Sequence, residues 1–238
     1  MSRIAQIEET RRKFLISALN ISALTSSFAL INACSQTPRK MNFSRSIYKL
    51  GGKVLINGQL ATLETRIIPG DSIITGEKSY IIFIVTGESF ILRSHSNMKL
   101  GEFRQPSPSI ASIDLLAGKM LSVFAPRKPM LISTPQAIVS IRGTGVYVES
   151  LKSHSYVCTC YGETEIRSRK QPSIRETIKA THHDAPKYIR QDGQKSLIES
   201  APFINHDDEE LLLIETLVGR QTPYLVPAGV TRSRKTYY

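Results

Sequence analysis

The segment Ala137-Ile138-Val139-Ser140-Ile141-Arg142-Gly143-Thr144-Gly145-Val146-Tyr147-Val148 decides the fold class of this chain. Residues with β-branched or aromatic side chains dominate both of its ends, which is typical of β-strands. Gly143 and Gly145 bracket Thr144 at the centre, and this spacing indicates a β-bulge or a close approach of two backbones. The segment therefore predicts two short strands, 137–141 and 146–151, with an irregularity between them.

Similar runs separated by turns extend in both directions from this segment. Asn57-Gly58 is a strong hairpin signal, and Pro69-Gly70-Asp71 is a second turn. Turns recur at intervals of roughly 8–12 residues, which is typical of all-β sandwiches. We therefore predict a mainly β fold, a sandwich or a roll. The other expected strands are 53–56, 59–64, 72–75, 80–85, 90–92, 113–116, 118–124, 130–133, 156–160 and 164–167.

Beyond residue 168 the pattern changes and predicts a C-terminal extension, 169–238, with helical content. Pro172 to Thr177 is expected to begin a short helix. Asp207 followed by Glu210 has the spacing of a capping box, and Gly219 supplies a stop signal. These signals predict one helix near residues 208–218, attached to a β domain that spans residues 48–168.

The N-terminus has the pattern of an export signal. Arg11 and Arg12 precede an apolar run that ends at Cys34, and the arginine pair resembles a twin-arginine signal. Residues 31–34 resemble a lipobox, in which Cys34 would carry the lipid. An uncleaved anchor helix over residues 14–33 is the alternative, because about 20 residues suffice to cross a bilayer. We predict a signal peptide with a lipobox (1–34) and a polar tether (35–47) that holds the domain on the periplasmic side of a bacterial membrane.

The charge of the chain limits the partners that we expect. The formal net charge is +11 at pH 7, which favours anionic partners such as lipid head groups or cell-wall polymers. The basic residues are scattered rather than arranged in a stripe. Because the protein is predicted to be exported, we expect no nucleic-acid partner.

Three motifs resemble the ferric-citrate regulator (FecR) domain. They are Gly70-Asp71-Ser72-Ile73-Ile74-Thr75-Gly76, Thr134-Pro135 and Arg142-Gly143-Thr144, and the resemblance covers about residues 50–168. It implies a β-rich domain outside the cytoplasm. The best-known members sense an outer-membrane transporter and signal to a sigma factor in the cytoplasm.

The chain departs from those members at its N-terminus. Those members have a cytoplasmic sigma-binding segment and a transmembrane helix, whereas here the apolar run begins at Phe14 and is predicted to be cleaved, so we expect no direct anti-sigma activity. The resemblance therefore implies a stand-alone binding or sensing protein of the cell envelope, with a role in iron uptake or envelope signalling. Its partner would be an envelope protein or a cell-wall polymer.

A second hypothesis is a metal-binding or redox protein. Cys158 and Cys160 fall in one predicted strand, so both thiols point to the same face. With His182, His183 and His206 they could bind Zn, Cu or Fe. Three alternatives remain: the cysteines pack as small apolar side chains, they form a strained disulfide, or the histidines simply belong to a turn.

Motifs of common enzyme classes are absent from the sequence. There is no Gly-x-Ser-x-Gly elbow, no His-Glu-x-x-His, no phosphate-binding loop and no dinucleotide fingerprint. The acidic residues 207–210 are explained by the start of a helix. We therefore expect no enzymatic activity, no catalytic residues and, on the leading hypothesis, no cofactor.

Overall fold

The computed structural model describes residues 45–103, 109–126, 130–190 and 197–224. The predicted signal peptide with Arg11, Arg12 and Cys34, and residues 35–44 of the predicted tether, lie outside these ranges. Within them the chain is mostly β, with a single short helix near its C-terminal end, so the predicted fold class is confirmed. No helix of the described residues combines the length and the apolar character needed to cross a membrane.

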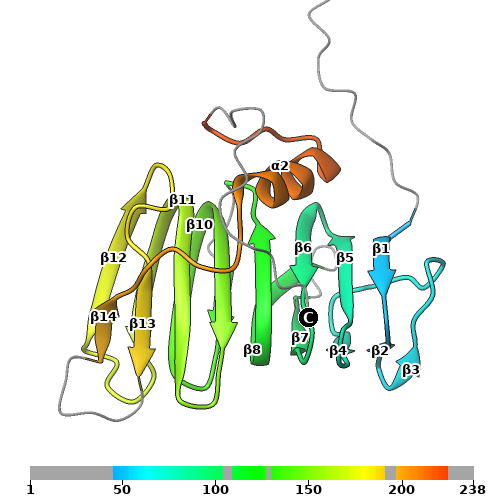
Figure 1. Ribbon diagram of the computed structural model, residues 1–238, viewed down its shortest axis with the longest axis horizontal. Helices are drawn as coiled ribbons and strands as arrows, with labels where there is room; N and C mark the ends of the chain where they lie inside the picture. The colour runs from blue at the N-terminus through cyan, green and yellow to red at the C-terminus, as the bar shows by residue number, and fades with distance from the viewer. Residues whose placement is uncertain (1–44, 104–108, 127–129, 191–196, 225–238) are drawn as a thin grey trace, which may run out of the picture. The chain divides into compact units, whose positions relative to one another are not determined.

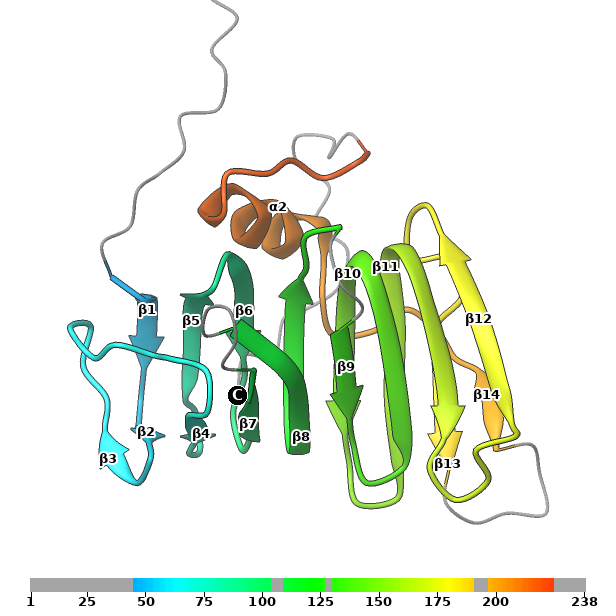
Figure 2. The same ribbon diagram turned by 180° about the vertical axis from the view of Figure 1, so that it is seen from behind.

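Figures 1 and 2 label the described strands and the helix. The strands are β1 (Ile47–Gly51), β2 (Val54–Ile56), β3 (Gln59–Leu60), β4 (Ser72–Thr75), β5 (Tyr80–Val85), β6 (Glu88–Leu92), β7 (Asn97–Phe103), β8 (Ser109–Val123), β9 (Met130–Ser133), β10 (Ala137–Ser150), β11 (His154–Ser168), β12 (Arg175–Ala180), β13 (Lys187–Arg190) and β14 (Ile198–Ser200). The helix is α2 (Asp208–Leu217).

Three long strands, β8, β10 and β11, divide the sheet into two halves, because each pairs with different neighbours at its two ends. One half-sheet runs β1, β5, β6, β8 (118–123), β10 (145–150), β11 (154–161), β13 and β14. The other runs β3, β2, β4, β7, β8 (109–117), β9, β10 (137–142), β11 (162–168) and β12. Every pair is antiparallel except β8 with β9.

Glycines mark the bends at which the long strands pass from one half-sheet to the other. Gly118, Gly143 and Gly162 have φ angles of 96°, 60° and 87°, in the left-handed region that favours glycine. At Gly143, a Cβ would also lie 2.6 Å from the Cα of Pro126. The register of β10 shifts between Arg142 and Val146, which confirms the predicted bulge.

The same bends correct part of the predicted strand list. The runs 113–116 and 118–124 both fall in β8, which ends at Val123. The runs 137–141 and 146–151 fall in β10, which ends at Ser150, and 156–160 and 164–167 belong to β11. A glycine inside a strand pattern indicates either a turn or a bend, and the sequence alone does not distinguish them. Here the chain continues in the same strand because each half finds its own partners.

The main hydrophobic core lies between the two half-sheets, and we call it the inner core. It is formed by the inward-facing residues of both halves, among them Phe83, Phe90, Leu115, Val139 and Val148. The rings of Phe83 and Phe90 stack with their centroids 4.9 Å apart. Burying each such side chain contributes about 1.5–3 kcal/mol.

Helix α2 covers the outward face of the first half-sheet and forms a second cluster, which we call the outer core. Its N-cap is Asp207, and the capping box with Glu210 is complete, so the predicted helix is confirmed. Leu211, Ile214 and Leu217 are buried there. Figures 1 and 2 both show α2 near β6 and β8, reached by a long segment that leads from β14. The sheet residues of the outer core are Ile82, Ile91, Leu121, Val123, Tyr147, Tyr156, Cys158, Cys160 and Tyr161.

The prediction of a short helix that begins at Pro172 is wrong. Residues 175–180 form strand β12 instead, which pairs with β11 from Gly162 to Arg167. Ile178 and Ala180 alternate with exposed residues, and the edge of β11 supplies backbone partners for β12. Strands β13 and β14 also extend the sheet beyond residue 168, and no run in the sequence indicated them.

Candidate metal centre

Four side chains from three separate segments meet in the outer core. Cys158 and Cys160 point outward from β11, and neither is accessible to solvent. His183 comes from the turn after β12, and His206 from the segment that leads into α2. Their potential ligand atoms all lie within 4.8 Å of one another, and we call this group the Cys2His2 cluster.

The turn 181–184 places His183 over strand β11. The carboxylate of Asp184 accepts hydrogen bonds from the backbone N–H and hydroxyl of Thr181, at 2.7 and 2.8 Å, and from the N–H of His182 at 3.2 Å. The bonds from Thr181 hold the pKa of Asp184 below its usual range. His183 adopts a φ of 54°, and its N–H donates to the carbonyl of Cys160 at 2.9 Å.

The hydrogen bonds of His206 and His183 determine which nitrogen of each ring faces the other. Nδ1 of His206 lies 2.7 Å from the carbonyl of Ile204, which can only accept, so this nitrogen carries the proton. Nε2 of His183 lies 3.1 Å from the Asp208 carboxylate and donates in the same way. In the neutral rings, Nδ1 of His183 and Nε2 of His206 therefore both present lone pairs, at a separation of 3.2 Å. Two lone pairs at this distance repel each other unless a cation or a proton lies between them, and the thiol of Cys158, 3.4 Å from Nδ1 of His183, can supply such a proton.

The two thiols differ in their tendency to ionise. Burial raises the pKa of Cys158, but hydrogen bonds with Cys160, His183 and His206 outweigh burial and bring it well below its usual range. Burial, together with the neighbouring Cys158, holds the pKa of Cys160 well above its usual range. The sulfur atoms of Cys158 and Cys160 are not bonded to each other in the structure, in contrast to the disulfide alternative. Both are buried, as in the alternative of apolar packing, but their neighbours include polar imidazole nitrogens, with Cys158 Sγ 3.4 Å from His183 Nδ1.

Asp208 lies beside the cluster and orients His183 through a hydrogen bond. Its Oδ1 accepts from Nε2 of His182 at 2.8 Å as well as from His183. Burial raises the pKa of Asp208, but the two histidines outweigh it and the pKa lies below its usual range. A carboxylate that orients a histidine in this way is the usual outer support of a metal ligand.

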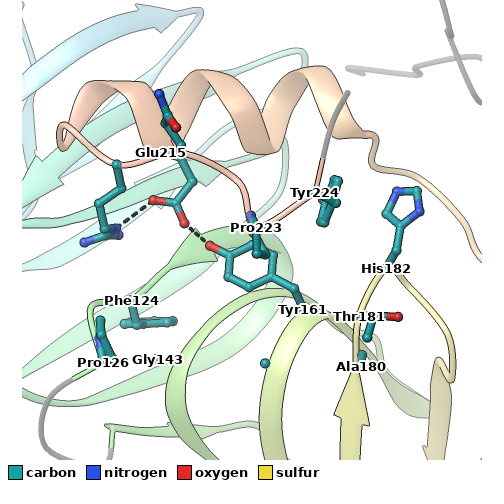
Figure 3. Close-up of a pocket in the computed structure, with 13 residues that line it drawn as sticks. Phe124, Pro126, Gly143, Tyr161, Ala180, Thr181, His182, Glu215, Pro223 and Tyr224 are labelled. Carbon is teal, nitrogen blue, oxygen red and sulfur yellow. Dashed lines mark hydrogen bonds and ion pairs between the residues drawn. The ribbon is translucent and has the colours of Figure 1, made fainter. Parts of the chain in front are cut away.

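Of the five predicted site residues, the structure brings four into the cluster and leaves one beside it. His182 lies beside the group, with its ring centroid 5.0 Å from that of His183 and its Nε2 bonded to Asp208, and its side chain is 37% exposed. It lines an open pocket of about 640 Å³ together with Tyr161, Glu215 and Tyr224 (Figure 3). With His183 and Asp208 it forms a second, smaller group of potential ligands.

Sequence reasoning missed Asp208 as a site residue. The acidic residues 207–210 begin the helix, as the sequence predicts, and Asp208 in addition accepts hydrogen bonds from two histidines. The signal that could have singled out Asp208 is its position two residues after His206, where the first turn of the helix points back toward the histidines. One residue thus serves the start of the helix and the cluster together.

The donor set fits Zn²⁺ better than other common ions. Two sulfur and two imidazole ligands are typical of closed, four-coordinate zinc sites. Both histidines are also oriented by a second hydrogen bond, one to a carboxylate and one to a backbone carbonyl. Cu and Fe accept the same ligand types, but their common protein sites use other arrangements, such as a long axial ligand or an open position.

A buried polar network surrounds the cluster and leads into α2. The ring of Tyr147 stacks on His206 with centroids 4.3 Å apart, and its hydroxyl donates to Glu149 at 2.7 Å. The guanidinium of Arg93 lies over the same ring at 5.6 Å. It also donates twice to the carboxylate of Glu210, at 3.0 and 2.9 Å.

No protein-family model matches this chain, and no curated protein matches it in sequence. Among solved structures, two crystal structures of a proposed anti-sigma factor from Parabacteroides distasonis are similar to it. Each has a TM-score of 0.45 and 13% sequence identity, over 55% of this chain and 58% of that one. The chain thus matches little more than half the length of these proteins, and a likeness at this level carries no argument about function. The resemblance to FecR domains stays a prediction.

Proposed function

We propose that the protein is a non-enzymatic metal-binding protein, which holds one Zn²⁺ ion between Cys158, Cys160, His183 and His206. The observation that carries the proposal is the convergence of two imidazole nitrogens, 3.2 Å apart, and two buried sulfur atoms, all within 4.8 Å of one another. A divalent cation at the centre of the group satisfies both lone pairs. It is also neutralised by the two thiolates that it stabilises.

The geometry favours a structural or regulatory ion over a catalytic one. A catalytic zinc site uses three protein ligands and keeps a position for water or substrate. Here four potential ligands converge, and three of them, Cys158, Cys160 and His206, have no exposed surface. The absence of hydrolase motifs from the sequence supports the same choice.

Around this centre we propose a regulatory or sensing protein of the cell envelope, of the FecR type. The motifs at Gly70–Gly76, Thr134-Pro135 and Arg142–Thr144 support this part of the proposal. Arg11 and Arg12 support export through the twin-arginine route, and Cys34 supports a lipid anchor on the periplasmic side. The partner would be an envelope protein or a cell-wall polymer, with a role in envelope signalling or iron uptake.

Elemental analysis of the untagged, full-length protein tests the metal centre. We expect about one zinc per chain after purification without chelators, and less than a tenth of that in Cys158→Ser. His95→Ala is the matched control, because His95 lies exposed in a turn of the β domain and should leave the zinc content unchanged. Metal-free wild-type protein that also fails to take up added Zn²⁺ would contradict the proposal.

The export route is tested separately in cells. Replacing Arg11 and Arg12 by lysine should leave the precursor in the cytoplasm. Replacing Cys34 by serine should abolish lipid labelling without stopping export. Normal export of the twin-lysine variant would contradict the assigned route and leave the metal centre untouched.

A further inference from the structure

We infer that the bound metal ion fixes residues 201–207 and the first turns of α2 to the outer face of the sheet, and we call these residues the arm and this role of the ion the clasp. Loss of the metal should then release the arm and leave the sheet folded. The inference rests on the proposed function, since it assigns a regulatory consequence to the same site. The new element is the effect that metal binding has on the rest of the molecule.

The first argument is the origin of the ligands. Cys158 and Cys160 belong to a long central strand, and His183 is bound to that strand through its N–H. These three ligands therefore stay with the sheet whether or not a metal is bound. His206 is the only member of the cluster that comes from the arm, so a bound ion would cross-link the arm to the sheet through this one residue.

The second argument is the position of His206 in the chain. It directly precedes Asp207, the N-cap of α2, and lies two residues before Asp208. Asp208 is in turn hydrogen-bonded to His182 and His183. The first turn of the helix and the cluster thus share the same hydrogen-bonded groups, and the helix cannot leave the sheet at this end while the site is assembled.

The third argument concerns what holds the arm without the ion. The polar links of the arm to the sheet include Arg93 to Glu210, the hydroxyl of Tyr156 to the carbonyl of Pro202, and Asn205 to Glu149. A helix of ten residues is marginal by itself, and α2 depends on burying Leu211, Ile214 and Leu217 against the sheet.

In the metal-free protein, Nδ1 of His183 and Nε2 of His206 can stay 3.2 Å apart only if a proton takes the place of the ion between them. Without that proton the two histidines separate, and this requires the arm to move away from β11.

The other end of α2 is anchored independently of the metal. Glu215 accepts hydrogen bonds from the hydroxyl of Tyr161 and from Arg220, the latter at 2.6 Å (Figure 3). Arg220 also donates to the carbonyl of Gly87 at 3.1 Å, in the turn between β5 and β6. Metal loss should therefore open the arm as a flap that remains attached at residues 215–220. The side chains that it uncovers, above all Tyr147 and Tyr156, face the site from the sheet.

Hydrogen–deuterium exchange of the untagged, full-length protein tests the clasp, with Zn²⁺ bound and after its removal by a chelator. We expect amides of residues 203–213 to exchange at least about tenfold faster without zinc. Amides in β8 and β10 should change by less than twofold, because the inner core holds these strands. Restoring Zn²⁺ should restore protection.

Two variants sharpen the result. His206→Gln removes the ligand from the arm and should show fast exchange of the arm at any zinc concentration, with β8 and β10 still protected. Arg220→Gln loosens the far anchor and leaves the cluster intact. In this variant zinc removal should release the whole helix, so that residues 214–217 also exchange about tenfold faster.

The outcomes separate this inference from the proposed function. Failure of the wild-type protein to bind zinc would overturn both. Stoichiometric zinc binding without any change in the exchange of residues 203–213 would overturn the clasp alone. A uniform increase in exchange over the whole domain would also overturn it, because the metal would then stabilise the entire fold rather than the arm.

Discussion

The inner and outer cores are built on opposite faces of the same strands, but from different side chains. The inner core contains aliphatic residues, phenylalanines and methionines, closed between two half-sheets. The outer core is covered by one short helix and contains tyrosines, cysteines and, at its edge, histidines and the buried Arg93–Glu210 pair. Apolar burial suffices where a second sheet supplies the cover. Where a ten-residue helix is the cover, specific polar links and, on our proposal, a metal ion complete the closure.

The largest expected effect belongs to the inner core. Phe90 is inaccessible to solvent, and its ring contacts those of Phe83 and Phe124 with centroids 4.9 and 5.9 Å away. Phe90→Ala should lower the free energy of unfolding by about 3–5 kcal/mol, measured in urea with zinc present. Zinc content per folded molecule should not change. A loss below about 1 kcal/mol would show that the inner core does not carry the stability of the domain.

The next effect concerns the ion pair between Arg93, the residue directly after β6, and Glu210 of α2. Arg93 and Glu210 both have side chains that are 4% exposed, so Arg93→Met leaves a buried carboxylate without its charge partner. We expect a loss of about 3 kcal/mol in the unfolding free energy. The double variant Arg93→Met, Glu210→Gln removes the charge as well and should recover a large part of it. Equal stability of the single and double variants would contradict this account.

A smaller effect is expected at the outer support of the metal centre. Asp208→Asn removes the carboxylate that orients His183 and leaves all four ligands in place. Zinc should bind about 10- to 100-fold more weakly, measured by competition with a chelating dye. Glu209→Gln is the control, because it removes the same charge from the same helical turn at an exposed position. An equal loss of zinc affinity in both variants would show that Asp208 acts only through its charge and not by orienting His183.

The smallest expected effect lies at the N-cap of α2. Asp207 accepts from the N–H of Glu210 at 3.0 Å, and Asp207→Ala removes this bond. The change should cost about 1 kcal/mol. It should appear as roughly fivefold faster amide exchange in α2, with the inner strands unaffected. Asp207→Asn, which can still cap the helix, should behave like the wild type, and a deficit as large as that of alanine would contradict the capping role.

Features that depend on neighbouring residues in the sequence were predictable. The alternation of side chains along a strand correctly placed Cys158 and Cys160 on one face, and the capping-box spacing correctly located α2. The predicted irregularity around Gly143 is also present. Each of these depends on φ, ψ and hydrogen bonds within a few residues.

Features that depend on distant partners were not predictable. The bends that join two predicted strands into β8, β10 and β11 exist because each half pairs with a different neighbour. Residues 175–180 became a strand rather than a helix because the edge of β11 was open to them. Of the adjacent His182 and His183, only the second enters the cluster, a choice made by the turn that Asp184 closes.

The sequence by itself determined the β-rich fold class, the capped helix and the residue types that could bind a metal, because side-chain period, capping and donor chemistry are local properties. Only the tertiary structure decided that residues 158, 160, 183 and 206 meet, and that Asp208 orients one of them. The physical reason is that the segments carrying them are brought together by burial of the outer core, and the energy of that burial belongs to no single segment.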